Sequence, residues 1–293
     1  MNEKKVSVII PFFSNINWLT LALDSVNSQL FKDFEVIVID DGSKHDLSGL
    51  YERYSFDMKI IKIENSGPSN ARNIGISLSR GKYIAFLDSD DIWDQKKLKV
   101  QVELMEKNSA VWSQHSYTMI YENGKKNKKI NTKKYSGDVF LKSFISLKIQ
   151  TSTIMVLREE LIKNNIKFPV NLRYGEDGEF YRELAIKHRL FFVDEYLSLF
   201  RIRENNAGFD PNIQLEDKKN TWERIKGNKK ITKILPDSII WAYKFSGYFY
   251  KISRKIDSKK INNKTYKGVM YLLYLPPYLI FKYNSWGIER KFK

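Results

Sequence analysis

Residues 81–93 read Gly81-Lys82-Tyr83-Ile84-Ala85-Phe86-Leu87-Asp88-Ser89-Asp90-Asp91-Ile92-Trp93. The run from Tyr83 to Leu87 is short, apolar and rich in aromatic and branched side chains, which is typical of a strand buried on both faces of a sheet. Three aspartates follow within four positions, and burying them without partners would be costly or would force them to take up protons. We therefore expect the cluster at the carboxyl end of the strand, where an α/β sheet has its ligand crevice.

Carboxylates spaced this closely suit a hard-oxygen site for Mg²⁺ or Mn²⁺ that is completed by phosphate oxygens. The alternative is a solvated turn before the next helix, with Asp91 or Asp94 as the N-cap. Short acidic turns are common, so the cluster needs support from the rest of the chain.

The preceding sequence predicts a parallel α/β sheet. Val6 to Ile10, Phe34 to Ile39 and Met58 to Ile63 are apolar runs of strand length, and helical patterns lie between the strands. Ser14 or Asn15 is placed to cap the first helix. Strands that alternate with helices in this way form right-handed βαβ units.

The loops that follow these strands argue against three classes of nucleotide-binding protein. Neither a dinucleotide-binding G-x-G-x-x-G motif nor a P-loop is present, and the first strand lacks the Gly-rich, basic loop of a nucleotidyltransferase. The second strand instead ends in Asp40-Asp41, whose carboxylates can accept hydrogen bonds from a nucleobase or a ribose. The alternative for this pair is a simple turn beside Gly42.

Composition narrows the chemistry further. The chain has no cysteine and three scattered histidines, which excludes disulfides and thiol nucleophiles and disfavours a zinc site. Met1 to Lys5 lead directly into a strand pattern without a signal peptide, and the apolar run 269–281 is too short to span a bilayer. We therefore expect a cytoplasmic protein.

The carboxyl-terminal third is unusually basic and aromatic. The chain carries a net charge of +16, of which residues 211–293, with 19 Lys and Arg against 6 Asp and Glu, contribute +13. Tyr, Trp and Phe are interleaved with these cations, a composition that suits an anionic membrane surface. An ordinary helical appendage that packs on the preceding domain is equally compatible. No nucleic-acid-binding motif is present, so we expect no nucleic-acid partner.

A second acidic pair lies at Glu176-Asp177, between Gly175 and Gly178 and directly before a helical pattern. Carboxylates at a helix N-terminus are stabilised by the helix dipole, so a capping role is one interpretation. The other is a general base held on a preorganised turn.

Together these segments resemble the family 2 glycosyltransferases, which use nucleotide-sugars and have the GT-A fold. The resemblance rests on five segments between about residues 5 and 205. They are Val6 to Pro11, Asp33 to Ser43, Asn70-Ala71-Arg72-Asn73-Ile74-Gly75, Gly81 to Trp93, and Glu176-Asp177. It implies a mostly parallel sheet flanked by helices over residues 1–210, followed by a helical basic and aromatic extension over 211–293.

The resemblance also implies roles for the donor-binding residues. Pro11, Asp40 and Asp41 would line the nucleoside pocket, and Arg72 would face the donor crevice and help to position the nucleotide-sugar. Asp88-Ser89-Asp90 corresponds to the family's D-x-D motif, in which Asp90 would ligate Mn²⁺ or Mg²⁺. Asp88 would reach the ribose or the donor sugar and share in the metal site.

At the acceptor side, Asp177 corresponds to the catalytic base of the family, with Glu176 beside it. The sequence departs from related transferases near the end of the domain, where an Arg is often followed two residues later by a His. Here these positions are Arg201 and Arg203. A guanidinium cannot ligate a metal, but it can bind a diphosphate in a bidentate manner.

The function implied is inverting transfer of a sugar, with UDP-sugar as the favoured donor, to a glycan or lipid-linked acceptor. Such enzymes build bacterial O-antigen, capsule or lipooligosaccharide, and the basic extension would bring this one to the anionic cytoplasmic face of the inner membrane. A catalytically inactive homologue that acts as a membrane-surface scaffold is the alternative. The metal and base carboxylates are all present, which favours the enzyme.

Overall fold

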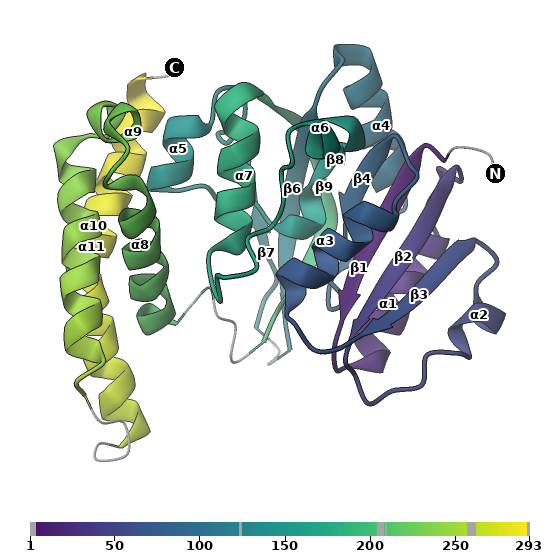
Figure 1. The fold of residues 1–293 in the computed structure, drawn as a ribbon, viewed down its shortest axis with the longest axis horizontal. Coiled ribbons are helices and arrows are strands. Elements are labelled where there is room, and N and C mark those ends of the chain that lie inside the picture. Colours follow the sequence, from purple (N-terminus) through teal and green to yellow (C-terminus); the bar gives the residue numbers. More distant parts are fainter. Residues whose placement is uncertain (1–3, 123–124, 204–207, 209, 257–261, 292–293) are drawn as a thin grey trace. The chain divides into compact units, whose positions relative to one another are not determined.

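The computed structural model describes residues 4–122, 125–203, 208, 210–256 and 262–291 (Figure 1). The chain divides into two compact units. The first, called here the sheet unit, comprises residues 1–139, 148–171 and 176–202. The second, the helical unit, comprises residues 140–147, 172–175 and 203–293. The boundary expected at residues 210/211 remains a prediction.

In the described part of the sheet unit, nine strands form one sheet in the order β3-β2-β1-β4-β8-β6-β9-β5, with β7 paired to β6. They are β1 (Val6–Phe12), β2 (Phe34–Asp41), β3 (Asp57–Ile63), β4 (Tyr83–Phe86), β5 (Ile92–Trp93), β6 (Trp112–Tyr121), β7 (Lys128–Ile130), β8 (Met155–Leu157) and β9 (Leu190–Ile202). The strands expected around residues 6–10, 34–39, 58–63 and 83–87 are therefore present.

The four amino-terminal strands are parallel, as β1 pairs with both β2 and β4, and β2 pairs with β3. β6 and β9 are also parallel over most of their length. Between the strands that the structure describes, antiparallel pairing involves β5, β7 and β8, which are two or three residues long. An isolated antiparallel bridge also joins Gly137 to Leu190 of β9. The predicted α/β class is confirmed, and these short strands make the sheet a mixed one.

Helices accompany the sheet within the same unit. They are α1 (Ile16–Asn27), α2 (Leu50–Arg53), α3 (Pro68–Leu78), α4 (Lys97–Asn108), α6 (Arg158–Lys163) and α7 (Glu176–Lys187), with a 3₁₀ turn at Thr151–Thr153. Asn15 caps α1 through its side chain, which accepts hydrogen bonds from two backbone amides of the first turn. Gly75 allows α3 to lie directly on β1, because a Cβ there would stand 2.4 Å from Cγ2 of Ile9.

Alternate residues of β2 enter two different cores. Val36 and Val38 belong to the core shared with α1, whereas Ile37 and Ile39 pack with Ala71 of α3. This alternation follows from the two-residue period of a strand. It decides the direction in which the acidic residues at the end of β2 point.

The helical unit contains α5 (Phe140–Ile145), α8 (Pro211–Ile225), α9 (Lys229–Ile234), α10 (Asp237–Ser253) and α11 (Asn263–Lys291). Its core gathers Ile239, Tyr243 and Phe281 with residues of α5. The hydroxyl of Tyr243 donates a hydrogen bond of 2.5 Å to the carbonyl oxygen of Phe144. Within the described residues, no helix combines the length and apolar character needed to cross a membrane.

Candidate active site

The acidic turn after β4 is held in place by its backbone. The amide of Leu87 donates to the carbonyl oxygen of Ile9 at 3.0 Å, and the amide of Asp88 donates to Oγ of Ser152 at 3.1 Å. Asp88, Ser89 and Asp90 are half-buried at this strand end, as the sequence predicts for a crevice residue.

Asp91 has a different role from its neighbours. It is fully buried, and its carboxylate accepts 2.5 Å and 3.0 Å hydrogen bonds from Oγ of Ser152 and the amide of Arg201. Burial, and then the charges of Asp90 and Asp88, raise the pKa of Asp91 well above its usual range. Asp91 is therefore a structural acid that ties β9 to the acidic turn. Neither Asp91 nor Asp94 is the N-cap that the alternative interpretation allowed, because α4 begins after Lys96 without a side-chain cap. Asp94 instead accepts a hydrogen bond from the amide of Lys96, before the helix begins.

Arg201 supports the same turn from β9. Its Nε donates to the carbonyl oxygen of Asp90 at 3.0 Å, and its guanidinium lies 5.5 Å from the ring centre of Trp18. The diphosphate-binding role expected of Arg201 remains a prediction. Arg203 is exposed and falls in the helical unit, so its role at the site also remains a prediction.

Arg72 connects the acidic turn to α7. Its Nη2 donates to Oδ1 of Asp88 at 2.6 Å, and its Nη1 lies 3.9 Å from Oε1 of Glu176. Burial opposes the charge of this guanidinium, but Asp88 and then Glu176 raise its pKa. Its Nε and Nη1 have no hydrogen-bond partner among the described residues. A buried guanidinium with two such nitrogens is suited to bind an anion.

Two residues that the sequence analysis missed position Arg72. The ring of Phe168 lies 5.2 Å from its guanidinium and stacks on Phe180 at 4.0 Å. Asn73, the next residue on α3, binds the backbone of Phe168 twice, donating to its carbonyl oxygen at 2.7 Å and accepting from its amide at 2.9 Å. Asn73 stands in a quoted motif, but nothing in the motif reveals a partner ninety-five residues away.

Glu176 and Asp177 lie in the first turn of α7 and are half-buried. Burial, and then the charge of Asp177, raise the pKa of Glu176 to about 7, although Arg72 opposes this shift. The Oδ1 of Asp177 accepts a 2.7 Å hydrogen bond from the amide of Gly178. The buried Tyr181 one turn further on shares a 3.0 Å hydrogen bond with Thr151. The structure thus brings Asp88, Arg72 and Glu176 together, while the chemical role of Asp177 remains a prediction.

Asp40 and Asp41 follow opposite faces of β2. Asp41 continues the face towards α3, where it accepts 2.7 Å and 2.9 Å hydrogen bonds from the amides of Ser66 and Gly67. Asp40 continues the other face and accepts a 2.7 Å hydrogen bond from the amide of Ser43. Both carboxylates stabilise the loops around the strand end. Their joint contribution to one nucleoside pocket, together with the half-buried Pro11 at the end of β1, remains a prediction.

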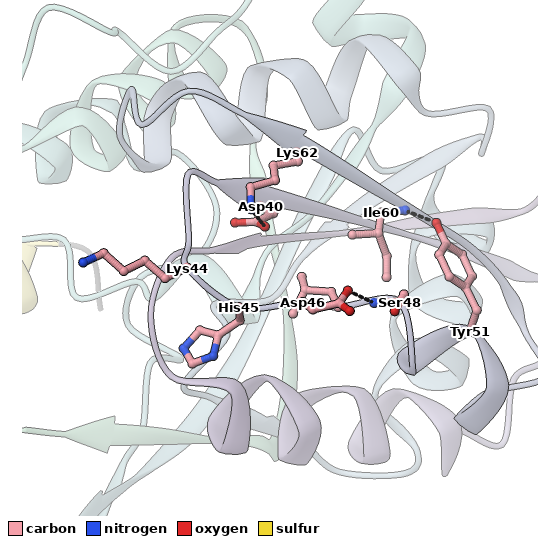
Figure 2. Close-up of a pocket in the computed structure, with 9 residues that line it drawn as sticks. Asp40, Lys44, His45, Asp46, Ser48, Tyr51, Ile60 and Lys62 are labelled. Carbon is pink, nitrogen blue, oxygen red and sulfur yellow. Dashed lines mark hydrogen bonds and ion pairs between the residues drawn. The ribbon is translucent and has the colours of Figure 1, made fainter.

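Asp40 borders a pocket of about 430 Å³. Figure 2 shows Asp40 and Lys62 on neighbouring strands, with His45 and Tyr51 on another segment that lines the pocket. The complete lining is Asp40, Lys44, His45, Asp46, Leu47, Ser48, Tyr51, Ile60 and Lys62. The Nζ of Lys62 lies 3.8 Å from the carboxylate of Asp40. The pocket therefore pairs carboxylates with amines and shares only Asp40 with the predicted site.

The sequence predicts only two protein ligands for the metal ion, Asp88 and Asp90. Among the residues that the structure describes, no group of three or more His, Asp or Glu side chains is placed to hold a metal ion. Mg²⁺ commonly takes only one or two protein carboxylates and completes its shell with substrate phosphates and water. The half-buried carboxylates of Asp88 and Asp90 supply donors of the right chemistry for that arrangement.

Comparison with known proteins finds a matching family and similar chains. The Glycosyl transferase family 2 model matches residues 7–165. An uncharacterised glycosyltransferase of Rickettsia bellii is 39% identical over 242 residues, which make up 82% of this chain and 35% of the relative. The minor teichoic acid biosynthesis protein GgaA of Bacillus subtilis is 31% identical over 198 residues, or 63% of this chain and 44% of GgaA. The chain thus spans about a third of the Rickettsia relative's length.

Two solved structures share the fold. S. aureus TarS 1-349 in complex with UDP-GlcNAc matches with a TM-score of 0.64 at 22% identity, over 87% of this chain and 77% of that one. The mannosyltransferase PcManGT of Pyrobaculum calidifontis, in complex with GDP-Man and Mn²⁺, matches with a TM-score of 0.59 at 13% identity, over 95% and 88%. At these identities the likeness concerns the fold alone, and it confirms the predicted GT-A architecture.

Proposed function

Because the chain belongs to glycosyl transferase family 2, as its motifs predict, we propose that it transfers a sugar from a nucleotide-sugar to a hydroxyl group of a glycan or lipid-linked acceptor. The observation that carries this proposal is the buried Arg72, which lies between Asp88 of the D-x-D turn and Glu176 of α7. One cation thereby links the donor side of the crevice to the first turn of α7, which is expected to supply the base.

UDP-sugar is the favoured donor. TarS was solved with UDP and with UDP-GlcNAc, whereas PcManGT was solved with GDP-Man, so the fold accommodates both nucleotides. Arg72 supports diphosphate binding, because its Nε and Nη1 have no hydrogen-bond partner among the described residues. A guanidinium in this state can form charge-assisted hydrogen bonds to phosphate oxygens.

Asp90 and Asp88 would hold Mn²⁺ or Mg²⁺ together with the donor diphosphate. A divalent ion, when bound, supplies Lewis-acid stabilisation of the charge that develops on the leaving diphosphate. Arg201 of β9 holds the backbone of Asp90 through a hydrogen bond from its Nε. The carboxylate of Asp91 accepts from the amide of Arg201 and so joins β9 to the acidic turn. The chain's own contribution is therefore an acidic turn held by hydrogen bonds from a distant strand.

Asp177 is proposed as the general base, with Glu176 beside it. The hydrogen bond from the amide of Gly178 holds the carboxylate of Asp177 in the first turn of α7. Glu176 is held towards Arg72 on the donor side. Asp177 would take the acceptor hydroxyl's proton as the oxygen attacks the anomeric carbon, and attack from the face opposite the diphosphate inverts that carbon.

The biological setting proposed is synthesis of a bacterial surface polysaccharide at the cytoplasmic face of the inner membrane. A relative named for minor teichoic acid biosynthesis supports a polymer of the cell surface. The surplus of basic residues in 211–293 supports contact with anionic lipid. The competing proposal, an inactive scaffold, requires the acidic site to serve no chemistry.

A donor-hydrolysis assay distinguishes the proposed transferase from the inactive scaffold. Purified protein is incubated with UDP-, GDP- and dTDP-sugars in the presence of Mn²⁺ or Mg²⁺, and release of the nucleoside diphosphate is measured. We expect turnover of one donor class that excess EDTA abolishes and added Mn²⁺ restores. Equal turnover with and without EDTA would refute the metal assignment, and no turnover of any donor would favour the scaffold.

A further inference from the structure

The aromatic residues of the helical unit separate into two groups. Trp222 and Tyr243 stack on each other at 6.3 Å, and Tyr243 is buried in the core of the unit. In contrast, Trp241, Phe245 and Tyr248 of α10 are 55%, 40% and 61% exposed. Trp222 belongs to α8, whereas Tyr243 and the three exposed rings belong to α10. Tyr243 is a member of the core of the unit and Trp222 packs against that core, and the three exposed rings are not part of it.

The exposed rings form a continuous stripe along α10. Their spacing of four and three residues brings them onto one face of a helix. The ring centroids of Trp241 and Phe245 are 5.9 Å apart, and Phe249 extends the contact from both Phe245 and Tyr248. Monomeric proteins seldom leave such a run of aromatic side chains in contact with water.

A row of cations runs beside this stripe. Lys244 and Lys251 are seven residues apart and exposed, and the ammonium of Lys244 lies 5.1 Å from the ring centre of Trp241. The only carboxylate in α10 is Asp237, in the first turn. The stripe therefore combines large amphipathic rings with cations and lacks neighbouring acids on its own helix.

We propose that Trp241, Phe245 and Tyr248, flanked by Lys244 and Lys251, dock on an anionic lipid bilayer with α10 lying in the interface. Tyr and Trp rings are favoured at the headgroup boundary, and lysine side chains extend to anionic headgroups from beside them. A second copy of the chain fits less well, because antiparallel pairing of two α10 stripes would bring the lysine rows together. The inference deepens the proposed function, on which it rests for the lipid-linked acceptor.

The experiment measures co-sedimentation of the full chain with vesicles of phosphatidylcholine, alone or mixed with phosphatidylglycerol. We expect binding only to the mixed vesicles, weakening as salt rises because exposed charges are screened over about 8–10 Å at physiological ionic strength. The double variant Trp241→Ser/Phe245→Ser should bind about tenfold more weakly, from partial burial of two rings. Lys244→Ala and Lys251→Ala should each weaken binding about fivefold.

A matched control removes two equally exposed apolar side chains from the sheet unit. Ile162 and Ile186 are 53% and 54% exposed, and the double variant Ile162→Ser/Ile186→Ser should bind as the wild type does. Brominated lipid should quench tryptophan fluorescence in the wild type, and Trp241→Phe should lose most of this quenching while still binding vesicles. Circular dichroism and thermal unfolding confirm that each variant is folded.

Three results would overturn the proposal: no vesicle binding by the wild type, wild-type binding by the α10 variants, or equal loss in the Ile162/Ile186 control. Sedimentation velocity adds a fourth, since a wild-type dimer that the α10 substitutions dissociate would assign the stripe to a second copy. Donor hydrolysis is measured in parallel without vesicles. If hydrolysis is absent while vesicle binding follows the expected pattern, the proposed function fails and the docking surface stands.

Discussion

The sheet unit and the helical unit differ in the side chains on which their proposed roles depend, which are buried in the first and exposed in the second. In the sheet unit, ionisable groups such as Arg72 of α3 and Asp91 of the acidic turn are buried and depend on neighbours from distant segments. In the helical unit, aromatic side chains such as Trp241 and Tyr248 are left exposed. Buried charges are costly unless a specific geometry satisfies them, and exposed rings gain only when something covers them. Under the two proposals, the sheet unit would carry out chemistry at one fixed site, and the helical unit would make contact over a surface.

The strongest test of this contrast is Asp90→Asn. Removing one carboxylate of the proposed metal pair should lower donor turnover by about 10³-fold or more, because metal stabilisation of the leaving group contributes several kcal/mol. Thermal unfolding should show that the variant is still folded, since the backbone of Asp90 still accepts from Arg201. Asp94→Asn is the matched control, as Asp94 is exposed and Asn can still accept from the amide of Lys96. Equal turnover by both variants would contradict the assignment.

Asp177→Asn should have the next largest effect. We expect kcat to fall by about 10²-fold or more, the usual scale for loss of a general base, with little change in the KM for the donor. Steady-state kinetics with a soluble acceptor separate the two parameters. Glu183→Gln, an exposed position on the same helix, should leave both unchanged. A near-wild-type kcat for Asp177→Asn would move the proposed role to Glu176.

Arg72→Lys should cause a smaller change, mainly in donor binding. A single ammonium cannot reproduce the planar contacts of Arg72 with Asp88 and Phe168 and also reach a diphosphate. We expect the donor KM to rise about tenfold, the loss of roughly one charge-assisted hydrogen bond. Arg53→Lys, at an exposed ion pair with Asp24, is the control and should leave the KM unchanged. An unaltered KM in Arg72→Lys would place the diphosphate elsewhere.

The sequence was sufficient to predict the elements that carry the site. Apolar runs gave the parallel strands, and the cost of burying carboxylates placed the Asp88 to Asp91 cluster at a strand end, where the structure has it. The same argument could not distinguish Asp90 from its neighbour Asp91, which is buried. That difference depends on Ser152 and on the backbone of Arg201, which lie 61 and 110 residues away.

Contacts at long separation explain the other omissions. The Asn73–Phe168 pairing that supports Arg72 joins residues 95 positions apart, and neither position carries a periodic signal for it. In the helical unit, the composition of the sequence showed that aromatic residues are abundant but did not show which of them are exposed. Only the packing of α10 separated the buried Tyr243 from the exposed Trp241, because a helical pattern defines faces without identifying what covers each one.

Lys97, in the sheet unit, is another ionisable group whose burial is costly. It is fully buried at the start of α4, with its Nζ 3.7 Å from the ring centre of Trp93. Nζ has no hydrogen-bond partner among the described residues, and the facing His115 of β6 is also fully buried. Burial lowers the pKa of Lys97 well below its usual range.

The smallest effect on turnover, and a gain in stability, is therefore expected for Lys97→Met. In the unfolded chain the amine is protonated at neutral pH, whereas the folded state disfavours the proton, so the wild type loses stability as pH falls below the ordinary lysine pKa. Methionine removes this cost, and we expect the free energy of unfolding to rise by about 1–4 kcal/mol at neutral pH. Urea unfolding across pH should show the gap between variant and wild type narrowing as pH rises towards the ordinary lysine pKa. Lys99→Met, at an exposed position of α4, should change stability by no more than about 0.5 kcal/mol at any pH. A destabilised Lys97→Met would mean that the amine has a polar partner in solution and that the cost of its burial is already offset.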